Sequence, residues 1–121
     1  MNKARIAVVM NYFAFRDDLV HQLGHEGFEV IIANEVAQAL NKIRKYSVNG
    51  IITQLNLPQF DGLELILNLR DLGIDIPIIV ISFEDSEMER EVLKAGATAF
   101  FNYPVEVATI IDLLRPKGIK R

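Results

Sequence analysis

Five short apolar segments alternate with five amphipathic segments along nearly the whole chain, and this alternation constrains the fold more than any other feature. The apolar segments, whose branched side chains favour buried strands, span residues 4–10, 28–33, 51–54, 76–82 and 98–102. The other segments repeat apolar residues at helical spacing over residues 14–26, 35–45, 62–72, 86–95 and 105–115. This pattern predicts a doubly wound α/β fold, in which helices cover both faces of a parallel sheet.

Length and composition favour one globular domain over residues 1–115. The chain has 121 residues, of which 50% are apolar and 24% charged, and its net charge is −3 with both signs interspersed. We therefore expect no direct contact with nucleic acid, and we interpret the basic residues 116–121 as a tail or the start of a linker. The absence of cysteine excludes disulfides and thiol chemistry. No apolar run approaches the roughly 20 residues that span a bilayer, so a cytoplasmic location is expected.

The segment from Gly50 to Gly62 combines a buried strand, a tight loop and the start of a helix. Its apolar part stops at Gln54, which places this polar side chain at the carboxyl end of the strand. Pro58 ends the regular structure, and Asp61 is predicted to cap the helix that follows. In open parallel sheets, ligands and chemistry gather at this end of the strands.

Three motifs together resemble the receiver domain of bacterial response regulators. They are Leu55–Leu65, Leu93–Ala97 and the pair Tyr103-Pro104, which stands where that family has Lys-Pro. The resemblance implies a five-stranded flavodoxin-like (βα)5 fold with strand order 2-1-3-4-5 and a cis bond before Pro104. It also implies a magnesium-dependent site where an aspartate at the end of strand three accepts a phosphoryl group from a histidine kinase.

The resemblance places the family's functional groups on residues with the wrong chemistry. The acidic pair maps onto Met10 and Asn11, the acceptor onto Gln54, a magnesium-binding carbonyl onto Asn56, the hydroxyl onto Ser82 and the lysine onto Tyr103. A carboxamide cannot form an acyl phosphate, and magnesium favours carboxylates over a thioether. We therefore predict a degenerate phospho-acceptor pocket with no catalytic residue, metal or cofactor, so that the chain is not an enzyme.

Other polar residues offer no replacement for the lost groups. Asp61 is assigned to helix capping, and Glu84 and Asp85 to the approach to the next helix. His21 and His25 have helical spacing, but no third metal ligand accompanies them. For Tyr103 we expect the ring to fill the emptied pocket, with its hydroxyl near Gln54 or Ser82; the alternative is a ring turned toward solvent.

The resemblance also implies a signalling surface, formed by the helix at 86–95, the strand at 98–102 and the helix at 105–115. Its aromatic switch residue maps onto Phe100. The last helix is apolar nearly all round, and the excess near Val105 and Leu113 predicts a protein contact through this face. The contact is expected to be a homodimer, and the alternative is cover by another part of a longer parent chain, such as a C-terminal output domain.

These features lead to one functional hypothesis and two alternatives. The hypothesis is a phosphorylation-independent receiver that serves as an interaction or dimerisation module in two-component signalling or transcriptional regulation. The first alternative is a receiver that still accepts a phosphoryl group by a non-standard route. The second is a flavin- or nucleotide-binding protein, which would need a glycine-rich loop after the first strand, where residues 11–15 are instead bulky and aromatic.

Overall fold

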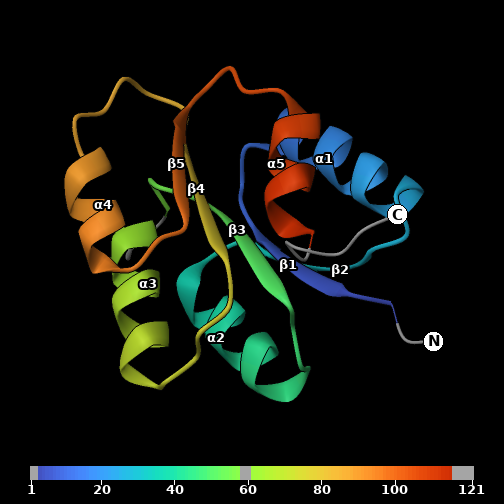
Figure 1. Cartoon of the computed structure of the whole chain (residues 1–121), viewed down its shortest axis with the longest axis horizontal. Coiled ribbons are helices and arrows are strands. Elements are labelled where there is room, and N and C mark those ends of the chain that lie inside the picture. Colours follow the sequence, from blue (N-terminus) through green and yellow to red (C-terminus); the bar gives the residue numbers. More distant parts are fainter. Residues whose placement is uncertain (1–2, 58–60, 116–121) are drawn as a thin grey trace.

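Five parallel strands form one sheet in the order β2-β1-β3-β4-β5 (Figure 1). The computed structural model describes residues 3–57 and 61–115. The strands are β1 (Arg5–Val9), β2 (Glu29–Ala33), β3 (Gly50–Gln54), β4 (Ile78–Ser82) and β5 (Ala99–Asn102). The helices are α1 (Phe13–His25), α2 (Val36–Lys45), α3 (Gly62–Asp71), α4 (Glu89–Ala95) and α5 (Val107–Leu114). The predicted doubly wound fold and its strand order are confirmed.

Each face of the sheet carries its own apolar core. Helices α1 and α5 cover one face, and α2, α3 and α4 cover the other (Figure 1). Neighbouring residues of one strand contribute to opposite cores: Ile51 packs with α3, whereas Ile52 packs with α1 and α5. Every residue of β3 and β4 is buried, which explains why apolar branched residues dominate both central strands up to the polar residues at their carboxyl ends.

The element boundaries follow local chemistry. Asp61 caps α3 as predicted, because its carboxylate accepts a hydrogen bond from the Glu64 N–H at 3.0 Å. Gly96 ends α4 with a positive φ of 122°. Helix α4 begins at Glu89, three residues later than the sequence suggested, since residues 86–88 form a turn in which the Ser86 hydroxyl accepts from the Met88 N–H.

Two sequence predictions lie outside the described residues: the loop at 58–60 and the basic tail at 116–121. Among the helices that the structure describes, none is long and apolar enough to cross a membrane.

Candidate functional site

The Gln54 side chain lies at the carboxyl end of β3 and bridges two loops. Its carboxamide oxygen accepts hydrogen bonds from the backbone N–H groups of Asn11 and Tyr12, at 2.9 and 3.2 Å. Its amide nitrogen donates to the Asn56 carbonyl oxygen at 2.6 Å. The residue is 8% exposed. Gln54 thus ties the loop after β1 to the loop after β3, and only this orientation of the carboxamide suits all three partners.

The backbone brings α3 unusually close to the end of β3. The Gly62 N–H donates to the Leu55 carbonyl at 2.7 Å. A Cβ atom added at Gly62 would lie 2.8 Å from the Gln54 carbonyl oxygen. Glycine at this position therefore allows the helix to start directly beside the bridging glutamine.

The two residues mapped onto the family's acidic pair lie in different surroundings. Met10 is completely buried and belongs to the core beneath α1 and α5. Asn11 contributes its backbone N–H to Gln54 and remains partly exposed. Within residues 3–57 and 61–115, no group of three or more histidine, cysteine, aspartate or glutamate residues converges as a metal site would require.

The Ser82 hydroxyl also has a hydrogen-bond partner within the chain. It is 1% exposed, and its hydroxyl donates a hydrogen bond to the backbone carbonyl of Glu84. The Ser82 hydroxyl therefore has its partner within its own loop. Throughout the described part of the chain, every buried side-chain nitrogen and oxygen has a hydrogen-bond partner.

The position of Tyr103 corrects the prediction that its hydroxyl reaches Gln54 or Ser82. The ring is 42% exposed, and no hydrogen bond joins its hydroxyl to either residue. It instead contacts Tyr12, Phe15 and Phe83, with ring centroids 5.9, 5.4 and 5.1 Å away. The Tyr103 ring packs against aromatic neighbours because the polar groups of Gln54 and Ser82 already have hydrogen-bond partners. The bond between Tyr103 and Pro104 is cis, as predicted.

These four rings form an aromatic cluster (Tyr12, Phe15, Phe83 and Tyr103) that was not predicted from the sequence. Tyr12 and Phe83 stack with centroids 4.2 Å apart, and Phe15 meets the Phe83 ring edge-on. The rings come from the chain just after β1, β4 and β5 and from α1. The available signal was an aromatic residue after each of three strands whose carboxyl ends lie on one edge.

The expected signalling surface is less apolar than the sequence suggested. Phe100 is 8% exposed and packs in the core beneath α2, α3 and α4. Val105 and Leu113 are partly buried against the other core, so the predicted apolar excess is small. The most exposed side chains of helix α5 are the small or polar ones of Ala108, Thr109 and Asp112, whereas Leu113 and Leu114 are partly buried.

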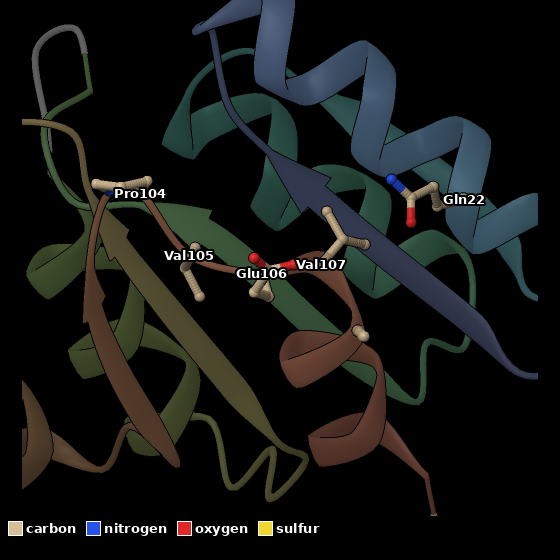
Figure 2. Close-up of a pocket in the computed structure, with 6 residues that line it drawn as sticks. Gln22, Pro104, Val105, Glu106 and Val107 are labelled. Atoms are coloured by element: carbon tan, nitrogen blue, oxygen red, sulfur yellow. The ribbon is translucent and has the colours of Figure 1, made fainter.

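A shallow hollow lies where this surface meets α1. Figure 2 shows Gln22 of α1 on one side and the segment from Pro104 to Val107 on the other. The amide of Gln22 donates to the Asp18 carboxylate, at 3.1 Å in its shorter contact. The hollow is lined by Val105 and Glu106 but not by Gln54, so it is separate from the mapped phospho-acceptor pocket.

Comparison with known proteins identifies the family. The profile of the response regulator receiver domain matches residues 6–115. The response regulators MprA of Mycobacterium leprae and Mycobacterium avium are 31% and 32% identical over 112 residues, which cover 92% of this chain and 49% of each relative. The chain therefore spans about half the length of these curated relatives.

Solved structures show the same fold. FixJ-N is 32% identical with a TM-score of 0.80, over 94% of this chain and 92% of that one. A CheY-like receiver domain from Methanospirillum hungatei is 28% identical, has a TM-score of 0.84, and matches over 92% of this chain and 90% of its own. A response regulator from Burkholderia pseudomallei, solved with a phosphorylated aspartic acid and a calcium ion, is 26% identical with a TM-score of 0.84 over 93% of this chain and 67% of its own. The chain belongs to the response regulator receiver domain family.

Proposed function

We propose that this chain is a receiver domain that works without phosphorylation, as a protein-interaction or dimerisation module in two-component signalling or transcriptional regulation. The observation that carries the proposal is the Gln54 carboxamide at the end of β3, held by Asn11, Tyr12 and Asn56. A carboxamide has no carboxylate oxygen that could attack a phosphoryl donor, so no acyl phosphate forms there.

The hydrogen bonds around Gln54 suit a neutral side chain. A carboxylate in the same position could accept from the Asn11 and Tyr12 N–H groups. Its second oxygen would then face the Asn56 carbonyl oxygen, which now accepts from the Gln54 amide at 2.6 Å. This arrangement supports a pocket that is complete without a cation or phosphate.

The same contacts support a constitutive state. Phosphorylation works as a switch when new charge attracts donors and rearranges loops. Here the loops after β1 and β3 are already joined through Gln54, and the Ser82 hydroxyl is engaged within its own loop. Control through partner binding or protein level fits this arrangement better than control through phosphate, and we propose no catalytic activity.

The interaction surface is the less specific part of the proposal. We propose a contact through the face formed by α4, β5 and α5, either with a second copy or with another part of a parent protein. Leu93 on α4 is 39% exposed, and Val105 and Leu113 add partly exposed apolar atoms. The matched relatives are about twice as long as this chain, which supports an output domain in the parent protein.

Phosphorylation by a small donor tests the proposal. The protein is incubated with acetyl phosphate and magnesium, and a receiver domain that keeps its aspartate is treated in parallel as a control. The masses of both are measured by intact mass spectrometry. We expect the control to gain one phosphoryl group and this chain to stay unchanged. A stoichiometric gain by this chain would support the alternative of a non-standard phosphorylation route.

A further inference from the structure

The edge of the sheet around Gln54 exposes large aromatic side chains. Tyr12 and Tyr103 of the aromatic cluster are 44% and 42% exposed, and Phe13, the first residue of α1, is 58% exposed. Three large rings in solvent at one edge exceed what packing requires, because Phe15 and Phe83 already cover the core beneath them.

Four of the five loops at this edge carry acidic residues, and none of the five carries a basic one. The described carboxyl-edge loops comprise residues 10–12, 34–35, 55–57, 61, 83–88 and 103–106, and their sequences contain no lysine or arginine. They contain six carboxylates: Glu35, Asp61, Glu84, Asp85, Glu87 and Glu106. Among the ion pairs of the described residues, none involves these six groups. Helix dipoles favour acids near helix starts, but they do not account for exposed rings among them.

We propose that this edge, with Tyr12, Phe13 and Tyr103 at its centre, binds an arginine-bearing segment of a protein partner. A guanidinium group stacks on aromatic faces and pairs with carboxylates at the same time, which a lysine ammonium does less well. The chain shows this chemistry on the surface itself, where its own Arg16 guanidinium lies 4.7 Å from the centre of the Phe13 ring.

Other occupants fit this surface less well. The carboxylates do not converge as a metal site requires within the described residues, so a single divalent ion finds no cage. Acidic loops repel nucleic-acid phosphates and anionic lipids. At the opposite edge of a second copy, Arg5 and Arg115 are paired with acids and Arg70 donates to backbone carbonyls. Among the described residues this leaves Arg44, exposed at the end of α2, as the arginine that edge could offer.

This inference deepens the proposed function, since it assumes that the chain acts by binding protein, and it names the chemistry of one partner. Its surface differs from the α4, β5 and α5 face. Phosphorylation by acetyl phosphate would overturn the proposed function and leave the peptide affinities below unchanged, so the two can fail separately.

The test uses a short fluorescent peptide of arginines separated by glycine and serine, with matched peptides in which every arginine is citrulline or lysine. Binding is measured by fluorescence anisotropy at low ionic strength. We expect the arginine peptide to bind, the lysine peptide to bind more weakly and the neutral citrulline peptide not to bind. Equal affinity for the arginine and citrulline peptides, or no binding of the arginine peptide, would overturn the inference.

Substitutions locate the site on the protein. Tyr12→Ala is expected to weaken arginine-peptide binding by about three- to tenfold, the range of one partly exposed cation–π contact. The matched control is Tyr46→Ala, which removes a ring of similar exposure at the opposite edge of the sheet. Phe13→Ala, at a more exposed position, gives a second variant if Tyr12→Ala does not fold. Equal effects of the edge and control variants would contradict the assignment.

Charge substitutions test the carboxylates in the same way. The double variant Glu84→Gln with Asp85→Asn should weaken binding and reduce its salt dependence, whereas Asp71→Asn with Asp75→Asn, at the opposite edge, should not. The oligomeric state of the protein without peptide is measured by analytical ultracentrifugation. A dimer that the Tyr12→Ala substitution dissociates would assign the surface to a second copy and overturn the inference.

Discussion

Replacing Gln54 by methionine removes the bridging carboxamide while nearly preserving the volume of the side chain. The substitution deletes three hydrogen bonds, to the N–H groups of Asn11 and Tyr12 and to the Asn56 carbonyl. A hydrogen bond contributes about 0.5–1.5 kcal/mol net, which gives a range of about 1.5–4.5 kcal/mol for three. Asn11 is only partly buried and Tyr12 is exposed, so water can hydrogen-bond to some of the backbone groups that lose Gln54. We therefore expect a loss of about 2–3 kcal/mol in the free energy of unfolding.

Urea unfolding, followed by circular dichroism, measures this loss. With a slope of about 2 kcal/mol per molar urea, the midpoint should fall by about 1 M or slightly more. The matched control is Gln38→Met, because Gln38 accepts one exposed hydrogen bond, from the Asn34 N–H at 2.9 Å. That variant should lose no more than about 1 kcal/mol. A Gln54→Met protein as stable as the control would refute the idea that this side chain holds the two loops together.

Three further substitutions test the framework around the site by the same unfolding measurement. Arg70→Met should lower the free energy of unfolding by about 2–3 kcal/mol, because the guanidinium donates to three backbone carbonyls, including that of Gly96 at 2.7 Å. Arg70→Lys should not restore the loss, because one ammonium cannot reach all three carbonyls. Gly62→Ala should cost about 1–3 kcal/mol and shift the amide resonance of Gln54, because the new methyl group meets the Gln54 carbonyl; an unshifted resonance would contradict the close approach. Arg115→Ala removes the exposed ion pair with Glu26 and should change the free energy of unfolding by less than about 1 kcal/mol. A larger loss would contradict the small contribution expected of an exposed pair.

The fold followed from the sequence because its signals are local and repeated. Alternation of strand and helix patterns predicted the parallel sheet, and the cap at Asp61 and the stop at Gly96 marked helix ends. The resemblance then gave the strand order and the cis bond before Pro104. The start of α4 was placed three residues too early, because a serine-bearing turn and a first helical turn have similar compositions.

The site was only partly predictable. Sequence placed Gln54 at the carboxyl end of β3, but its partners are backbone groups of the loops after β1 and β3, whose directions no pattern encodes. The prediction for Tyr103 was wrong for the same reason: its neighbour Phe83 is distant in sequence and competes better for the ring than polar groups that are already paired. The apolar face of α5 was overestimated because Leu113 covers core atoms as well as surface.

Binding of a phosphoryl mimic measures the central claim most directly. Magnesium and beryllofluoride are titrated into the protein, and the amide resonances of Asn11, Gln54 and Tyr103 are followed by NMR, beside a receiver domain that keeps its aspartate. A pocket already filled by its own hydrogen bonds should leave all three resonances in place while the control shifts. Saturable movement of these resonances, with magnesium and beryllofluoride both required, would contradict the account.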